Sequence, residues 1–353
     1  MARRGAPARV PVRTPIVEDD GVTFTWHGPG SSVVVVGSWC GWRLDEGLPM
    51  EPTGEDWAAH LALDRDAYVE YRLIVDGEPV RDPGNPHRVA NGFDGVNQQL
   101  WMPEAVRRAE VLRSRRGPRG EIRRGHVTLG WLAAAPKRRR LDLYLPPIDA
   151  DRDTLPLLVV LDGPDYLDRG RLHRILDGLI RDRAMAPLAA AFVGNAGPSR
   201  GAEYIGADPA LTSLIEDVVP EAVDRAGLGP QGSPDGGLGR AAILGSSAGG
   251  VLALHAALRR PDVFGRAICQ SVAAFEDPEL ATIALVRYGP VSPARLWLDA
   301  ADHEWLAGPN DRLAALLRER GYDVTYRRQH GGHDQTSWTE SLVDALPALF
   351  PPA

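Results

Sequence analysis

The sequence predicts an α/β fold, in which a mostly parallel central sheet is covered by helices, preceded by a small all-β sandwich domain. Short strand patterns with no helical period fill the first part of the chain, up to Pro103. After Leu141, apolar strands alternate with helical segments, which is typical of a parallel sheet covered on both faces. With 353 residues, 44% of them hydrophobic, the chain is long enough to form two cores.

The first domain is expected to be a β-sandwich over residues 19–104. Its predicted strands are Val22–Trp26, Ser32–Gly37, Ala58–Leu63 and Tyr68–Val75. An Asp76-Gly77 pair after the last of them favours a tight hairpin turn. Residues 1–18, which begin with arginines and prolines and contain no apolar run, are expected to be a disordered tail.

Two arginine-rich stretches are interpreted as solvated. Residues 105–124 are dense in arginine, contain Gly117 and Pro118, and show no sustained apolar face, so they are predicted to form a surface linker. The cluster Lys137–Arg140 is predicted to form a solvated hairpin tip, with an anion-binding patch as the alternative.

The second domain, residues 125–353, is expected to hold the parallel sheet. Its buried strands are predicted at Leu157–Leu161, Leu188–Val193, Ala241–Leu244, Arg266–Gln270 and Leu296–Leu298. Helices are predicted at Arg171–Ala184, Leu211–Ala226, Ala248–Arg259 and Pro309–Arg320. Ligands of such sheets bind at the carboxyl ends of the strands, and candidate site residues are therefore sought there.

The pentapeptide Gly245-Ser246-Ser247-Ala248-Gly249 lies between a predicted strand and a predicted helix. In that context a GxSxG motif forms the nucleophile elbow of an α/β-hydrolase, where glycines prevent collisions around a strained serine. The N-terminus of the following helix directs backbone N–H groups at a developing oxyanion. We therefore predict Ser247 as a nucleophile; the alternative is a chance match in a glycine-rich chain.

A serine nucleophile needs a histidine base, which follows it in the chain order serine, acid, histidine. His333 is favoured, because two glycines before it allow its loop to turn toward the elbow after the predicted strand Asp323–Arg328. His330 is the second candidate and His303 the third.

The acid that orients the histidine should follow the strand Leu296–Leu298. Asp302 is preferred because it lies in the expected loop, where a carboxylate can reach the imidazole. Asp299, which continues the strand, and Glu304 are the alternatives.

These residues resemble a known family. The elbow followed by "HAALRRPDVFGRAICQS", a strand ending in an acid, and "GGHD" with Trp338 shortly after it are similar to the enterochelin esterase and esterase D-like branch of the α/β-hydrolases. Two further segments are similar to the same branch: "YLPP" at Tyr144–Pro147 and "VVLDG" at Val159–Gly163. The first domain resembles the immunoglobulin-like modules that precede enterochelin esterases and glycogen-branching enzymes, in "VGSW" at Val36–Trp39 and "DPGNP" at Asp82–Pro86.

The resemblance implies hydrolysis of an ester through an acyl-enzyme, with a ferric catecholate siderophore as the expected small-molecule substrate. It also implies a second oxyanion donor, beside the N–H of Ala248, in the loop Asp162–Asp165. Pro164 has no N–H, so Gly163 is expected to supply the donor, with Asp165 as the alternative. Carbohydrate or small-acyl esterases of the same branch, and a binding protein without turnover, are the other functions considered.

Substrate contacts are expected from the loop Asn195–Asp208, which leaves a strand at its carboxyl end. Arg200, Glu203 and Tyr204 are the candidates there, because a trianionic ferric tris-catecholate suits arginine with aromatic walls; Trp338 is added from the resemblance. In the alternative interpretation, Arg200 and Glu203 pair with each other and order the loop. Tryptophans of the first domain could bind sugars, but packing is preferred for this set: Trp26, Trp39, Trp42, Trp57 and Trp101.

Composition excludes several other classes of function. A formal net charge of −7 argues against a nucleic-acid partner, and no apolar stretch approaches the length of a membrane helix. Cys40 and Cys269 lack the spacing of a disulfide framework or a zinc site, and no metal or cofactor is expected. The cytoplasm is the expected location, and the oligomeric state is left open.

Overall fold

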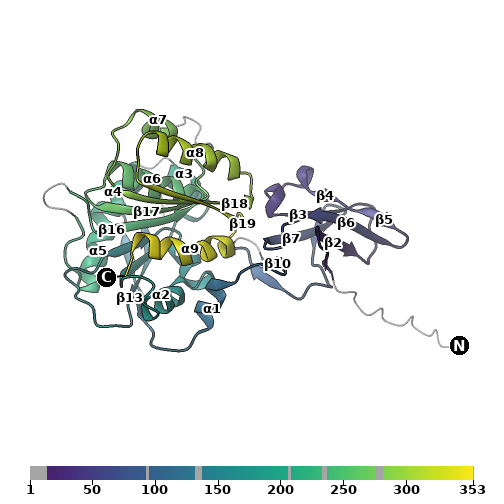
Figure 1. Cartoon of the computed structure of the whole chain (residues 1–353), viewed down its shortest axis with the longest axis horizontal. Helices are drawn as coiled ribbons and strands as arrows, with labels where there is room; N and C mark the ends of the chain where they lie inside the picture. The colour runs from purple at the N-terminus through teal and green to yellow at the C-terminus, as the bar shows by residue number, and fades with distance from the viewer. Residues whose placement is uncertain are drawn as a thin grey trace. The chain divides into compact units, whose positions relative to one another are not determined.

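The computed structural model describes residues 14–92, 95–131, 137–205, 208–232, 237–274 and 281–352. The chain divides into two compact units (Figure 1). The first holds the described residues up to Val106 together with His330–Asp334, and the second holds Arg107–Gln329 and the residues from Gln335 onward.

The first unit contains two antiparallel sheets, as expected for a sandwich. One sheet has the order β1-β2-β6-β5, formed by Ile16–Val17, Gly21–Trp26, Asp56–Ala62 and Glu51–Thr53. The other has the order β4-β3-β7-β10-β9, with β8 paired to β7; its strands are Leu48–Pro49, Val33–Gly37, Tyr68–Val75, Val96–Trp101, Arg88–Ala90 and Glu78–Val80. The prediction of a disordered tail over residues 1–18 is wrong for Ile16–Val17, because these two residues form a strand that pairs with β2. Residues 1–13 lie outside the described residues.

Alternating side chains form the core of the first unit. Val22 and Phe24 of β2 are fully buried, and the Phe24 ring meets that of Tyr71 from β7 edge-on at 4.8 Å between centroids. Asp76 and Gly77 have φ values of 52° and 87°, the left-handed pair that a type I′ hairpin turn requires. Three of the five tryptophans pack against this core, in agreement with the packing interpretation: Trp26, Trp39 and Trp57.

The second unit is built on one large sheet. Its strands have the order β11-β13-β15-β14-β16-β17-β18-β19, with β12 paired to β13. The pairings among β15, β14, β16, β17 and β18 are all parallel, whereas β13 runs antiparallel to β15. The bounds, from β11 to β19 along the chain, are Glu121–Arg123, His126–Thr128, Arg138–Leu145, Leu157–Val160, Ala189–Val193, Ala241–Ser246, Phe264–Gln270, Arg295–His303 and Val324–Gly332. All five predicted parallel strands are confirmed.

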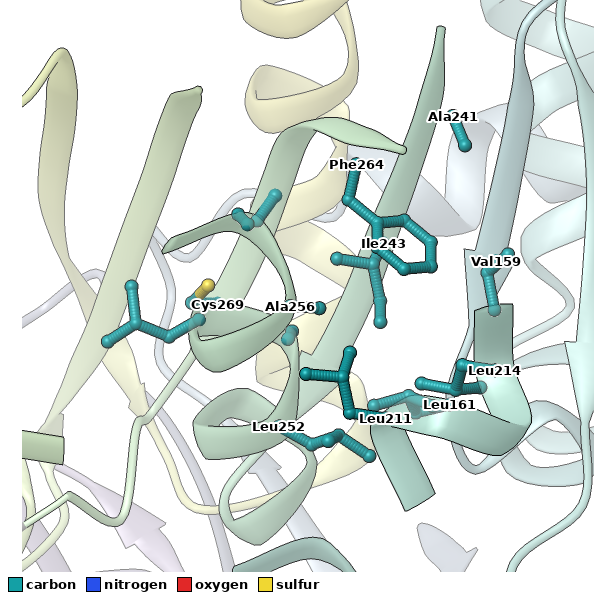
Figure 2. Close-up of a cluster of buried hydrophobic side chains, with 14 of the residues drawn as sticks. Val159, Leu161, Leu211, Leu214, Ala241, Ile243, Leu252, Ala256, Phe264 and Cys269 are labelled. Carbon is teal, nitrogen blue, oxygen red and sulfur yellow. The ribbon is translucent and has the colours of Figure 1, made fainter. Parts of the chain in front are cut away.

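Two helical layers cover this sheet, because its strands are apolar on both faces. Val159 and Ile243 face one core layer, which includes side chains of α6 (Ala248–Arg259) and α8 (Ala307–Glu319). Leu158 and Leu244 face the other, with side chains of α1, α2 and α9. Figure 1 shows these two sets of helices on opposite sides of the strands, and Figure 2 shows Ala256 of α6 beside Ile243 in the first layer, with Leu252 of α6 near Leu211. The remaining bounds are Arg108–Ser114 (α1), Leu172–Arg181 (α2), Arg200–Ile205 (α3), Asp208–Ser213 (α4), Val219–Ala226 (α5), Ala281–Tyr288 (α7) and Gln335–Leu349 (α9).

The prediction of a surface linker at residues 105–124 is wrong for much of that range. Residues 108–114 form helix α1, whose Ala109 and Leu112 are buried in the second core layer, and residues 121–123 form strand β11 on the edge of the sheet. Two buried apolar residues give too weak a periodicity to mark so short a helix. Its arginines act as anchors, since Arg108 forms two hydrogen bonds with Asp344 of α9, at 2.8 and 2.7 Å.

The solvated hairpin tip predicted at Lys137–Arg140 is also partly wrong. Residues 138–140 belong to strand β13, which pairs with β12. Arg139 is only 2% exposed and forms an ion pair with Glu203. A buried strand can hold an arginine when a carboxylate meets it, and that partner is 64 residues away in the sequence.

Candidate active site

Ser247 occupies a strained turn between β16 and α6. Its φ of 58° and ψ of −122° lie outside the regions that side chains favour. The Ser247 N–H donates to the carbonyl of Gln270 at 2.9 Å, and the Ser247 carbonyl accepts the N–H of Gly250 at 3.0 Å. Such strain persists only where the surroundings impose it, and at the start of a helix it is the geometry of a nucleophile elbow.

Glycine is required on one side of this turn by close backbone approach. A Cβ atom on Gly245 would lie 2.2 Å from the carbonyl oxygen of Gly249. The pentapeptide therefore has a steric reason for its first glycine, as the sequence motif predicts.

A second strained turn follows strand β14, beside the elbow strand in the sheet. Asp162 has a φ of 51°, and a Cβ atom on Gly163 would lie 2.2 Å from the carbonyl carbon of Phe192. Because the carboxyl ends of parallel strands meet at one edge, this turn and Ser247 lie at the same edge of the sheet. The N–H of Asp165 donates to the Asp162 carbonyl at 2.9 Å. Because the Asp165 N–H already has this acceptor, Gly163 is favoured over Asp165 as a donor to an external anion.

Replacing Gly163 by alanine is expected to destabilise the protein by about 1–3 kcal/mol, because the added methyl group must displace the backbone of β15. Unfolding in urea measures the effect. Gly201→Ala is the control, since a Cβ atom there meets nothing within 4 Å. An unchanged midpoint for Gly163→Ala would show that the turn tolerates a side chain.

Arg200 connects the two turns. Its Nε and Nη2 atoms donate to the two carboxylate oxygens of Asp162, both at 2.7 Å, and Nη2 also donates to the carbonyl of Ser246 at 3.0 Å. Asn195 Nδ2 adds a bond of 2.6 Å to Asp162 Oδ1. The carboxylate raises the pKa of Arg200 further, against the effect of burial, so the cation is permanent. The strained Asp162 is therefore held by three side-chain bonds.

Three of the residues that sequence analysis assigns to substrate have internal partners: Arg200, Glu203 and Tyr204. Arg200 binds Asp162 rather than Glu203, so the predicted pair within the loop is wrong. Glu203 binds the buried Arg139, and burial raises the pKa of its carboxyl group. Tyr204 is buried, and its hydroxyl accepts the Asp162 N–H at 3.4 Å. These three residues lie on α3, where a loop was expected, and Arg200 and Tyr204 contact Asp162 of the second turn.

Asp299 is fully buried, and its hydrogen-bond partners are interior side chains. Its Oδ2 atom accepts bonds from Gln270 at 3.1 Å, from Trp297 at 3.0 Å, and from the hydroxyl of Ser341. Burial nevertheless raises the pKa of Asp299 to about 6. A carboxyl group held in this way among the core side chains is poorly suited to orient a histidine at the surface of the site.

Strand β18 extends five residues beyond its predicted end and reaches His303, so Asp302 lies on the strand rather than in a loop. Asp302 is partly exposed and pairs with Arg328 at 2.5 Å. Glu304 is buried, and its Oε1 atom accepts the N–H of Ala301 at 3.0 Å. Both carboxylates lie at the edge of the sheet that carries Ser247, because β16, β17 and β18 run parallel.

The first two histidine candidates, His330 and His333, lie on either side of the end of strand β19. His333 follows the last residue of β19, Gly332, and precedes α9, whereas His330 is inside the strand. Both belong to the short segment grouped with the first unit. Trp338 lies in α9 and donates from its indole nitrogen to the hydroxyl of Ser271 at 2.9 Å, one residue beyond β17.

A possible metal-binding group occurs in the first unit, among the described residues. Ligand atoms of Glu18, Asp20 and His60 lie within 4.8 Å of one another, and all three side chains are exposed. The imidazole of His60 pairs with Glu18 at 3.1 Å and with Asp20 at 3.7 Å. Separately, none of the helices described is both long and apolar enough to cross a membrane.

Comparison with solved structures identifies the fold. The enterobactin esterase from Shigella flexneri, in the presence of enterobactin, matches with a TM-score of 0.78 at 19% identity, over 95% of this chain and 94% of that one. The ferric enterobactin esterase from Salmonella typhimurium matches with a TM-score of 0.78 at 20% identity, over 97% of both chains. A ferulic acid esterase matches with a TM-score of 0.55 at 16% identity, over 67% of this chain and all of the other. The predicted α/β-hydrolase fold with an all-β N-terminal domain is confirmed.

Sequence comparison gives relatives of the same kind. The iron(III) enterobactin esterase of Dickeya dadantii is 27% identical over 60% of this chain and 52% of its own length. The iron(III) salmochelin esterase of Escherichia coli O6:H1 is 23% identical over 65% of this chain and 59% of its own. The chain thus spans little more than half the length of these curated relatives. Residues 21–99 match the glycogen recognition site of AMP-activated protein kinase, and residues 133–349 match the family described as putative esterase. With most of its second unit covered by that match, the chain belongs to the putative esterase family.

Proposed function

We propose that this protein is a serine carboxylic ester hydrolase that acts through an acyl-enzyme. Ser247 is the nucleophile, His333 the base and Asp302 the acid that orients the base. The observation that carries the proposal is the strained backbone of Ser247, with φ of 58° and ψ of −122°, between a parallel strand and a helix.

The reaction follows from these roles. The Ser247 hydroxyl oxygen attacks the ester carbonyl carbon while the His333 imidazole takes its proton, and the carbonyl oxygen becomes an oxyanion. The N–H groups of Ala248 and Gly163 stabilise that oxyanion. When the carbon–oxygen bond to the alcohol breaks, the imidazolium returns the proton to the departing oxygen. Water, activated by the same imidazole, then releases the acid from Ser247.

Substituting Asp302 by asparagine is expected to lower kcat by about 10⁴-fold, because the amide would favour the wrong histidine tautomer. Steady-state hydrolysis of p-nitrophenyl acetate measures it. Glu304→Gln, which alters the competing carboxylate two residues later, is expected to stay within about tenfold of the wild type. If Glu304→Gln causes the large loss and Asp302→Asn does not, Glu304 is the acid.

For the substrate we propose a ferric catecholate siderophore ester, whose hydrolysis releases iron. Support comes from the relatives, which are esterases of iron(III) enterobactin and iron(III) salmochelin, and from a solved structure of similar fold studied with enterobactin. Arg200, Glu203 and Tyr204 stay in this proposal as substrate contacts, and each also has an internal partner that holds it in place. Trp338 remains in it as a residue of α9 near the end of β17.

The substrate proposal is tested by comparing initial rates on iron-loaded enterobactin with those on feruloylated and acetylated oligosaccharides. Faster cleavage of the siderophore is expected, and Ser247→Ala is the blank. Exclusive cleavage of the sugar esters would instead identify a carbohydrate esterase, the second candidate, which the similar fold of a ferulic acid esterase favours. Tight siderophore binding without turnover would identify a binding protein.

The cytoplasmic location predicted from the sequence is part of the same proposal. Cys40 and Cys269 are both buried free thiols, as is usual in a reducing compartment. Cell fractionation tests the location.

A further inference from the structure

Gln270, the last residue of β17, is fully buried and makes hydrogen bonds in four directions. Its backbone carbonyl accepts the Ser247 N–H at 2.9 Å. Its Oε1 atom accepts the hydroxyl of Tyr166 at 2.8 Å. Its Nε2 atom donates to Asp299 Oδ2 at 3.1 Å and to the carbonyl of Trp338 at 2.9 Å. One amide thus uses its acceptor and both donors in the interior.

Each partner of Gln270 belongs to a different segment of the candidate site. Tyr166 lies in the π-helical turn η3 (Asp165–Arg169), three residues after Gly163. Asp299 lies on β18, three residues before Asp302, and Trp338 lies on α9, five residues after His333. The side chain therefore joins the oxyanion turn, the acid strand and the helix that follows the histidine, while its backbone holds the nucleophile.

The chemistry of these contacts is specific to glutamine. The Tyr166 hydroxyl stays protonated, because burial raises its pKa, and so it needs an acceptor. Asp299 and the Trp338 carbonyl need donors. A methionine of similar volume would leave all three groups without this partner in a fully buried place, where an unmade hydrogen bond is costly. A glutamate would add a second carboxyl group beside Asp299.

We propose that Gln270 is a positioning residue of the esterase: it sets the place of Ser247 and holds the oxyanion turn, the acid strand and the histidine-bearing end of the chain in register. It contacts no substrate and acts through the groups that do. The inference rests on the proposed function, because it assigns Gln270 a part in the reaction of Ser247.

The chain offers a matched control in Gln231. This glutamine is also buried; its Oε1 atom accepts the N–H of Leu157 at 3.0 Å, and its Nε2 atom donates to the carbonyls of Leu155 and Gly229 at 3.2 and 2.9 Å. Its partners lie at the amino end of β14, the opposite edge of the sheet from Ser247. At each position, replacement by methionine removes one hydrogen bond that the side chain accepts and two that it donates.

The experiment compares Gln270→Met and Gln231→Met by their urea midpoints and by the rate at which a fluorophosphonate labels Ser247 in the folded fraction. Both variants are expected to lose stability. Only Gln270→Met is expected to label more slowly, by about 10- to 100-fold, because an error of about 1 Å in a reacting group has an effect of this size. In ester hydrolysis the loss should fall on kcat and leave KM unchanged.

Gln270→Glu keeps the size of the side chain and supplies a second readout. When protonated, its carboxyl group can donate to Asp299; when ionised, it places a second negative charge beside that buried carboxyl. Asp299 on β18 and Tyr166 on η3 are the titratable groups that contact this position. The activity of Gln270→Glu relative to the wild type at the same pH is therefore expected to be higher at pH 5 than at pH 8.

The outcomes separate the two claims. A wild-type protein that is not labelled at Ser247 overturns the proposed function, and this role with it. A labelled wild type with Gln270→Met equally fast, or with Gln231→Met equally slow, overturns the positioning role alone. If Gln270→Met does not fold, Gln270→Glu decides. The positioning role is overturned if the activity of Gln270→Glu relative to the wild type is the same at pH 5 and at pH 8.

Discussion

Replacing Ser247 by alanine is expected to lower the rate of ester hydrolysis by about 10⁶-fold, the size of loss seen when a triad serine is removed. The acyl-enzyme cannot form without the hydroxyl oxygen, and the helix and the two strained turns can then contribute only binding and oxyanion stabilisation. Turnover of p-nitrophenyl acetate, measured as kcat/KM, gives the effect directly.

Ser292→Ala is the control for the loss of a buried hydroxyl. Ser292 donates to the carbonyl of Ala257 at 2.7 Å, near the C-terminal end of α6 rather than at the elbow. It is expected to change stability slightly and activity by less than about twofold. Retention of more than about a hundredth of the wild-type rate in Ser247→Ala would mean that another group is the nucleophile.

The second large effect is expected for His333. His333→Ala should lower kcat by about 10⁴- to 10⁶-fold, because the serine proton then has no base to receive it. His330→Ala is the comparison, since His330 is only three residues away but lies within β19. It is expected to stay within a few-fold of the wild type, and a reversed pair of results would assign the base to His330.

Local patterns in the sequence predict most of the fold. The continuous apolar strands β14 to β17 are recognisable without any tertiary information, and helix α6 begins and ends where its pattern predicts. The elbow is predictable for the same reason, because the pentapeptide, the strand and the helix are adjacent in the chain. Helix α1 was not predicted, since a seven-residue helix with two buried residues shows almost no period.

The support around the site could not be predicted, because it depends on contacts between distant residues. Arg200 meets Asp162 across 38 positions of the chain, and Gln270 meets Tyr166 across 104. No local signal distinguishes an arginine that faces a substrate from one that holds a strained turn. The sequence therefore could not reveal that Arg200 binds Asp162 and that Glu203 binds Arg139, because only folding brings these partners together.

Covalent trapping tests the central claim most directly. The protein is incubated with a fluorophosphonate at pH 7.5, digested, and the modified peptide is sequenced by mass spectrometry. The account predicts one phosphonate on Ser247, with labelling lost in Ser247→Ala and strongly slowed in His333→Ala. A protein that turns over esters but carries the label on another residue, or carries none, would contradict it.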